Sequence, residues 1–228
     1  MKKIWALTIA LVLACCSVNA FAAGKLSTVK ENFWVISSYW ADAAYAYAKV
    51  ENTGDKQIDV NAGILEIYDE KGDVITSGNY LQVYPRCLQP GEYTYVSMGM
   101  EVGQAKDIGK PDSYKLVITG KTDDESSTVR LPVEMRLDEG EWWKQDYIYA
   151  TVTNNTEETV YDILTVFATL DAEGNILCID SDSQFAAYGL APGSSVVVRR
   201  EINKAFINFF TAKEITPATV DAIAYVNK

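Results

Sequence analysis

The chain has 228 residues, 48% of them hydrophobic, with a formal net charge of −11 and no histidine. The acidic balance argues against nucleic acid and anionic membrane surfaces as partners, because both attract basic patches. The absence of histidine excludes Ser-His-Asp and Cys-His catalysis and removes the commonest zinc ligand. We therefore expect no cofactor and no metal.

Residues 1–22 have the pattern of a secretory signal peptide. A positively charged start is followed by an apolar run over residues 4–16 and an A-x-A cleavage site at residues 20–22, with Ala23 as the first mature residue. A lipoprotein signal with acylation of Cys15 is the alternative. The apolar run is shorter than the roughly 20 residues of a spanning helix. We expect no transmembrane segment and an extracytoplasmic protein, whether secreted, periplasmic or on the cell surface.

The remaining chain is a duplication at a spacing of 102 residues. A repeat of this length indicates two domains of one fold rather than a solenoid of short units. We expect domains over residues 23–121 and 122–228, joined at the polar segment 121–127 and lying close together. The matching pairs are Trp40/Trp142, Tyr45/Tyr147, Tyr47/Tyr149, Ala48/Ala150, Val50/Val152, Asn52/Asn154, Asp69/Asp171, Gly72/Gly174, Leu88/Leu190, Pro90/Pro192 and Gly91/Gly193.

Each unit has the pattern of short strands, with alternating side-chain character, separated by turns, which is typical of an all-β sandwich. In the first unit small apolar residues at 46, 48 and 50 alternate with Tyr45, Tyr47 and Lys49, and the second unit repeats this from Tyr147. Five extra residues in the second unit, near residues 203–210, predict a short helix over one end of the sandwich. The strands expected are residues 45–50, 64–68, 74–75, 93–96 and 114–119, then 147–152, 164–167, 176–177, 196–198 and 222–226.

The turn and core residues resemble the FxLYD family of bacterial extracytoplasmic domains. The motifs are a strand ending in Val-x-Asn, then Leu65-x-Ile67-Tyr68-Asp69-x-x-Gly72 and Leu88-x-Pro90-Gly91, repeated as Phe167-x-Thr169-Leu170-Asp171-x-x-Gly174 and Leu190-x-Pro192-Gly193. The resemblance covers about 55 residues of each unit and implies two tandem immunoglobulin-like antiparallel β-sandwiches. It implies no reaction, since fold alone does not fix function.

Cleavage at residue 22 leaves two cysteines, Cys87 and Cys178, which do not occupy equivalent repeat positions. Either they form one bridge between the domains or they are two buried free thiols. The turns at Asp69 and Asp171 carry oxygen ligands of the kind that calcium prefers. A tight hairpin explains the same residues, and we predict no metal there.

Two clusters of acidic residues lie in predicted loops, at residues 123–125 and 138–141. Paired carboxylates can hydrolyse glycosides, so a carboxylate-dependent glycoside hydrolase is a weaker alternative. Solvated turns account for both clusters more simply. We expect no catalytic residues.

An aromatic set that recurs in both units is the candidate ligand-binding site. If the small residues face the core, the tyrosines line an outer sheet face and can stack on sugars or anchor a protein. The alternatives are that the tyrosines are core residues or lie buried between the domains. The candidate residues are Trp40, Tyr45, Tyr47, Trp142, Trp143, Tyr147 and Tyr149.

The sequence therefore predicts a non-enzymatic exported protein that binds a protein or glycan of the cell envelope. A structural spacer or accessory subunit without a ligand site is the alternative. Exposure or burial of the repeated aromatic residues separates these two functions.

Overall fold

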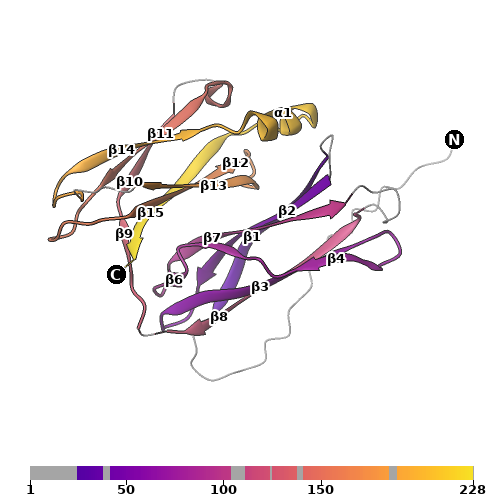
Figure 1. The fold of residues 1–228 in the computed structure, drawn as a ribbon, viewed down its shortest axis with the longest axis horizontal. Helices are drawn as coiled ribbons and strands as arrows, with labels where there is room; N and C mark the ends of the chain where they lie inside the picture. Colours follow the sequence, from indigo (N-terminus) through magenta and orange to yellow (C-terminus); the bar gives the residue numbers. More distant parts are fainter. Residues whose placement is uncertain are drawn as a thin grey trace.

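The structure, a computed structural model, describes residues 25–37, 42–103, 111–123, 125–137, 141–184 and 189–227. Within these residues the fold is all-β and antiparallel, as the sequence predicts, with two successive sandwiches (Figure 1). The expected signal peptide lies outside the described residues. Among the residues that the structure describes, no helix is long and apolar enough to span a membrane.

The first sandwich packs a sheet of strand order β1-β2-β7-β5 against a sheet of order β4-β3-β6, with β8 also paired to β3. Ala46, Ala48 and Val50 point into the core between the sheets and are buried, which confirms the alternation expected for this strand. The strands are β1 Leu26–Ser37, β2 Asp42–Asn52, β3 Ile58–Tyr68, β4 Val74–Gly78, β5 Gln82–Tyr84, β6 Cys87–Leu88, β7 Tyr93–Gly103 and β8 Ser113–Thr122.

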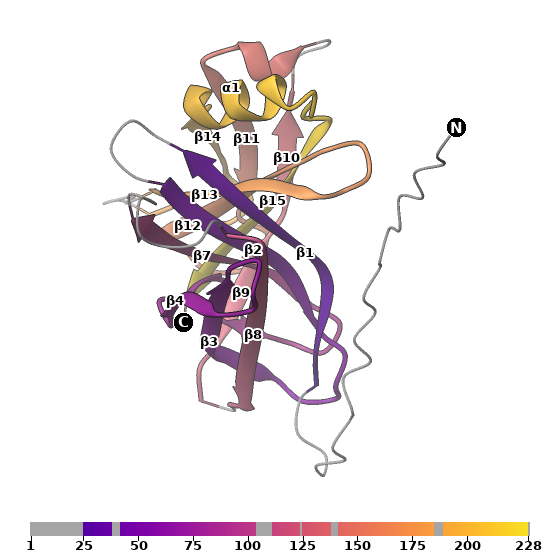
Figure 2. The same cartoon turned by 90° about the vertical axis from the view of Figure 1, so that its right-hand side faces the viewer.

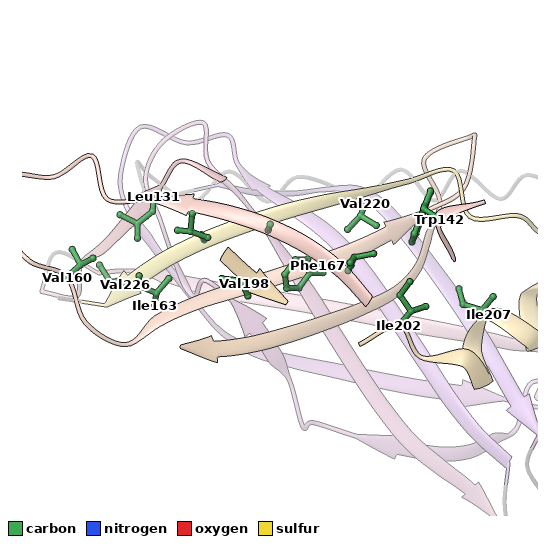
Figure 3. Close-up of a cluster of buried hydrophobic side chains, with 14 residues drawn as sticks. Leu131, Trp142, Val160, Ile163, Phe167, Val198, Ile202, Ile207, Val220 and Val226 are labelled. Carbon is green, nitrogen blue, oxygen red and sulfur yellow. The ribbon is translucent and has the colours of Figure 1, made fainter. Parts of the chain in front are cut away.

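The second sandwich packs a sheet of order β10-β11-β14 against a sheet of order β13-β12-β15-β9. Its core includes Trp142, Phe167 and Val198 (Figure 3). The elements are β9 Thr128–Leu131, β10 Val133–Arg136, the 3₁₀ helix η1 Trp142–Lys144, β11 Tyr147–Thr153, β12 Ile163–Leu170, β13 Ile176–Gln184, β14 Ser195–Glu201, α1 Lys204–Ala212 and β15 Thr219–Asn227.

The strand pairings identify the equivalent residues of the two sandwiches. Lys49 lies opposite Tyr95 in the first sandwich, and Thr151 lies opposite Val197 in the second. On the other sheet, Ile64 lies opposite Val117, and Val166 lies opposite Ile223. Equivalent residues can therefore be compared across the two sandwiches, one sheet at a time.

A buried asparagine closes one end of each sandwich with the same bonds. Asn52 Nδ2 donates to the Lys56 carbonyl at 2.7 Å and the Leu88 carbonyl at 3.0 Å. Asn154 Nδ2 donates to the equivalent carbonyls of Glu158 and Leu190 at 2.8 and 2.7 Å. The Pro-Gly turns add a backbone bond to each asparagine carbonyl at 2.8 Å. The repeated Val-x-Asn and Leu-x-Pro-Gly motifs of each sandwich are thus joined by one set of hydrogen bonds, which we call the asparagine lock.

The Asp-Gly loops are hairpin turns whose carboxylates bind backbone. Asp69 Oδ1 accepts from the amides of Lys71 and Asp73 at 2.8 and 3.0 Å. Asp171 Oδ1 accepts from the amides two and four residues later at 3.0 and 2.7 Å. Gly72 has a φ of 83°, a conformation that favours glycine. The turn geometry thus uses the carboxylates that calcium would need.

Helix α1 occupies the segment where the sequence predicts one. The Asn203 side chain caps it by accepting from the amides of Ala205 and Phe206 at 3.1 and 3.3 Å. Ile207 packs into the core of the second sandwich. The helix lies over one end of that sandwich, beside β11 and β14 (Figure 2).

The four sheets stack as four layers (Figure 1). The β1-β2-β7-β5 sheet and the β13-β12-β15-β9 sheet form the two middle layers, so the sandwiches meet through one sheet of each. The β4-β3-β8 and β10-β11-β14 sheets form the two outermost layers. Each sandwich therefore presents one sheet to its neighbour and the other to the outside.

Candidate binding faces

The tyrosines of the first unit form a contact between the sandwiches. We define the inner tyrosine face as Tyr45, Tyr47, Tyr93 and Tyr95, on the β2 and β7 surface that points away from the first core. It packs on the receiving face of the second sandwich, which consists of Val166, Ala168, Ile176, Cys178, Ile223 and Tyr225. Burial between domains, one of the arrangements left open by the sequence, is therefore what the first unit shows.

Asp221 on β15 is the polar centre of this contact. Its Oδ2 accepts hydrogen bonds from the Tyr93 hydroxyl at 2.9 Å and the Tyr95 hydroxyl at 2.6 Å. Lys49 Nζ lies 3.5 Å from the same oxygen and 3.6 Å from the centre of the Tyr93 ring. One carboxylate thus satisfies two hydroxyls and an ammonium group that the contact removes from most of the solvent.

Further bonds fix the register of the two sandwiches at the ends of this face. Trp34 Nε1 and Asn32 Nδ2 both donate to the Ile176 carbonyl, at 3.1 and 3.2 Å. At the other end, Arg130 donates to the Tyr93 carbonyl and its Nε lies 3.2 Å from Glu92 Oε1. The contact therefore combines an apolar centre with polar bonds at its margins, as stable protein interfaces do.

Helix α1 extends the contact with aromatic rings. Phe210, which is fully buried, meets Trp34 edge-on at 5.0 Å between ring centres. Phe206 meets Tyr45 in a similar way at 5.2 Å. The extra residues of the second unit thus cover the end of the inner tyrosine face.

Burial changes the acidity of the tyrosines in the contact. It raises the pKa of Tyr93 to about 12, with a further contribution from the negative charge of Asp221. The pKa values of Tyr47 and Tyr95 are raised further, mainly because burial disfavours the phenolate. These hydroxyls are therefore neutral hydrogen-bond donors over the whole physiological range.

The repeated tyrosines of the second unit, Tyr147 and Tyr149, lie at the surface. We define the outer tyrosine face as Tyr147, Tyr149, Val197 and Arg199, on β11 and β14. Tyr149 is 38% exposed and Val197 50%, whereas their equivalents Tyr47 and Tyr95 are 3% and 0% exposed. The Arg199 guanidinium lies over the Tyr147 ring, 4.4 Å from its centre. The same face of the fold is thus buried in one copy and free in the other.

The predicted binding residues do not form one surface. Tyr47 is buried against the second sandwich and Trp142 in the core of the second sandwich, so neither can meet an external ligand in this arrangement; the prediction for these two is corrected. Tyr45 packs on Phe206 in the contact. Trp143 is partly buried against the second core. Trp40 lies outside the described residues. Of the seven candidates, Tyr147 and Tyr149 lie on the outer tyrosine face.

Sequence reasoning missed residues that matter most to the contact: Trp34, Tyr93, Tyr95 and Asp221. Two signals could have found them. Tyr93 and Tyr95 alternate in phase along one strand, as Tyr45 and Tyr47 do. Asp221 is an acid within a strand that is otherwise largely apolar, from Val220 to Val226. A lone charge in such a strand indicates a specific partner.

The two cysteines that the structure describes, Cys87 and Cys178, are free and buried, one in each sandwich, in keeping with the alternative of two buried thiols. Burial raises the pKa of Cys178 to about 12 and also raises that of Cys87. Cys87 borders a hollow of about 550 Å³ between the sandwiches, where Asp59 pairs with Arg86 at 3.2 Å. A thiol with a raised pKa is a poor nucleophile at neutral pH.

The acidic clusters take part in local structure where they are described. Asp123 Oδ1 accepts from the Glu125 amide at 2.9 Å and so shapes the linker between the sandwiches. Glu141 pairs with Lys144 at 2.6 Å. In the described part of the chain, no three His, Cys, Asp or Glu side chains gather closely enough to hold a metal ion.

No protein-family model and no curated protein matches this chain. Among solved structures, a red sea bream transglutaminase is similar over 89% of this chain at 9% identity, with a TM-score of 0.24. The chain spans 30% of the length of that protein. A likeness this distant carries no argument about function.

Proposed function

We propose that the protein is a non-enzymatic binding module that acts outside the cytoplasm and contacts a protein through its outer tyrosine face. One observation carries the proposal. The equivalent face of the first sandwich is already a protein contact, buried against the receiving face of the second. The second copy keeps both strand tyrosines, and there Tyr149 and the neighbouring Val197 are exposed. Exposed apolar and aromatic residues grouped on one sheet are typical of an interaction site.

The composition of this face favours a protein over a glycan. Sugar binding by tyrosine needs an open ring face, and the Arg199 guanidinium occupies one face of the Tyr147 ring. Tyrosine and arginine are instead among the residues enriched at the centres of protein interfaces. We therefore assign the face to a protein partner.

The proposal of a binding role rests also on the chemistry of the chain. The sequence has no histidine, and burial raises the pKa of both thiols that follow the proposed signal peptide. The extracytoplasmic location rests on the signal pattern of residues 1–22 and on the FxLYD resemblance. That resemblance is to domains of the cell envelope that carry no reaction.

A structural spacer is the second candidate, and the inner tyrosine face favours it. That contact holds the two sandwiches in one orientation through hydrogen bonds, a salt bridge and a shared apolar cluster. Such a joint suits a rigid accessory subunit as well as a binding module. The two roles differ in whether the outer tyrosine face is occupied.

The test compares the chain beginning at Ala23 with a variant in which Tyr149→Ser and Val197→Ser are combined. Both would be immobilised and probed with fractionated envelope proteins and with a glycan array. We expect saturable binding of a protein by the wild type and loss of that binding in the variant, with unfolding unchanged. The same change on an exposed tyrosine away from the face, Tyr161→Ser, is the control. Binding that survives in the double variant would leave the spacer as the better description.

A further inference from the structure

The two outermost layers of the chain carry the unpartnered equivalents of the faces that join its sandwiches. We infer that a second copy of this chain is the partner: the outer tyrosine face of one copy packs on the first sandwich of the next. The inference rests on the proposed function of the outer tyrosine face and names what it binds. It repeats between chains the contact already present within one.

The receiving face has an exposed counterpart on the first sandwich. We define this exposed counterpart as Ile64, Val74 and Val117 with Glu66 and Lys115. The strand pairings place Ile64 and Val117 where the receiving face has Val166 and Ile223. Their exposed fractions are 48% for Ile64, 55% for Val74 and 38% for Val117.

Exposed apolar side chains concentrate on these two faces. Among the described residues, eight large hydrophobic side chains are exposed: Val29, Ile64, Val74, Tyr80, Val117, Tyr149, Tyr161 and Val197. Five of them belong to the outer tyrosine face or to the exposed counterpart. Scattered exposed residues would need no explanation, but five at positions equivalent to a buried contact point to a second contact of the same kind.

The charges on the two faces have changed together. Within the chain, Asp221 meets Lys49, Tyr93 and Tyr95. The equivalent of Asp221 on the exposed counterpart is Lys115, as the pairings with Ala168 and Glu66 show. If the outer tyrosine face kept the groups of the inner one, its lysine would repel Lys115 and its three hydrogen-bond donors would lack an acceptor.

The outer tyrosine face has lost all three groups that bind Asp221. Thr151 stands in place of Lys49, Ser195 in place of Tyr93 and Val197 in place of Tyr95. Thr151 therefore places no positive charge opposite Lys115, and its hydroxyl can accept a hydrogen bond from that lysine. Glu66, which lies 3.7 Å from the Lys115 ammonium, gives the exposed counterpart a negative group, and Arg199 gives the outer tyrosine face a positive one. The two surfaces remain complementary although neither keeps the original pair.

The geometry of the layers sets the form of the assembly. The two faces lie on opposite ends of the four-layer stack, so a second chain continues the stack rather than closing it (Figure 1). A contact between unlike faces is heterologous, and it produces open arrays when the rotation does not close a ring. With two fewer tyrosines than the inner contact, it is also weaker, so the assembly forms reversibly and grows with concentration.

The test uses two variants of the chain from Ala23, each with one face disabled. Val197→Glu disables the outer tyrosine face and Ile64→Glu disables the exposed counterpart. Sedimentation velocity of the wild type over a concentration series is expected to show reversible growth. Each variant alone should stay monomeric, with association weakened at least about tenfold by the buried charge. The control Tyr161→Glu places the same charge on an exposed residue outside both faces and should associate like the wild type.

The decisive measurement is the mixture of the two variants. Each keeps the face that the other lacks, so the mixture is expected to form a dimer of one copy of each and nothing larger. Arg199→Glu and Val117→Glu replace the two variants if either fails to fold. A wild type that stays monomeric, or a single variant that still dimerises alone, would overturn the inference. If the wild type is monomeric but its outer tyrosine face still captures an envelope protein, the proposed function stands and the self-association does not.

Discussion

Tyr47 and Tyr149 occupy the same position of the repeat, yet the first is buried between the sandwiches and the second is exposed to solvent. Both follow the same strand pattern and both point away from a core of alanine and valine. What differs is the sheet opposite them. Tyr47 faces β12, β13 and β15 of the second sandwich. Tyr149 is exposed on β11, which belongs to an outermost layer (Figure 1).

This difference predicts unequal costs for the same substitution. Tyr47→Ser removes a ring buried against Cys178 and Val166 and should lower the free energy of unfolding by about 3 kcal/mol, as large-to-small core changes do. Tyr149→Ser should change it by less than about 0.5 kcal/mol. Urea unfolding followed by tryptophan fluorescence measures both. Tyr47→Phe, which keeps the ring, is the control and should stay close to the wild type; equal costs for the two serine variants would contradict the contact.

Substitution of Asp221, which binds three groups of the contact, should lower the stability more than substitution of an acid on the surface. Asp221→Ala leaves the Tyr93 and Tyr95 hydroxyls without their acceptor and should destabilise the protein by about 2–3 kcal/mol. Asp146 pairs with Lys204 at 3.7 Å on the surface, and Asp146→Ala should cost less than about 1 kcal/mol. Thermal unfolding of both variants tests the comparison. Asp221→Asn keeps an acceptor oxygen and should recover part of the loss.

The raised tyrosine pKa values predict loss of stability at alkaline pH. Tyrosine ionises near pH 10 when unfolded, whereas Tyr93 does so at about 12 and Tyr95 higher still in the folded protein. The unfolded state therefore releases protons first, and the stabilisation, complete below pH 10, falls as the pH rises from 10 through 12. Denaturant midpoints between pH 8 and pH 12 measure it. Replacing both residues with phenylalanine should make the fall smaller and leave the part that Tyr47 contributes. An unchanged fall would contradict the raised pKa values of Tyr93 and Tyr95.

Cys178 predicts a slow reaction with thiol reagents. Its thiol is buried under the inner tyrosine face with a pKa of about 12, so both access and thiolate are lacking at neutral pH. In a Cys87→Ser background, Cys178 should be labelled only in molecules whose two sandwiches have separated. Tyr47→Ser should accelerate labelling by about tenfold or more, in proportion to the lost stability. Tyr149→Ser, the matched change outside the contact, should leave the rate unaltered.

Local patterns were enough to predict much of each sandwich. The alternation around Tyr45 and Tyr147 gave strands with alanine inward, and the Asp-Gly and Pro-Gly turns fall between strands as expected. The extra aromatic segment of the second unit forms helix α1. These features depend on neighbours close in sequence, so the period of the apolar residues and the turn residues suffice to indicate them.

The burial of one tyrosine pair and the exposure of the other could not be predicted in this way. The two strands are nearly identical in their own residues, and their difference arises from β12, β13 and β15, which are distant in sequence. Asp221 lies 128 residues beyond Tyr93, yet its carboxylate is the acceptor of that hydroxyl. Strand β1, which supplies Trp34, also went unrecognised, because its residues 26–37 mix polar and apolar side chains without strict alternation.

The asparagine locks have a consequence for the order in which the chain folds. The bond from Asn52 to the Leu88 carbonyl spans 36 residues, and the bond from Asn154 to the Leu190 carbonyl spans the same number. Neither can form until the strands between have come together, because closing so long a loop costs entropy that earlier contacts must offset. Each lock is thus a late event in its own half.

Asn52→Ala and Asn154→Ala should accordingly speed unfolding and leave the refolding rate nearly unchanged, as expected for contacts absent from the transition state. Stopped-flow chevron plots separate the two rates, and a slowed refolding arm would place the asparagine in the nucleus instead. Because each sandwich closes with its own asparagine, the two halves of the duplicated chain can complete their folding in either order. The contact through the inner tyrosine face is then made between two finished surfaces.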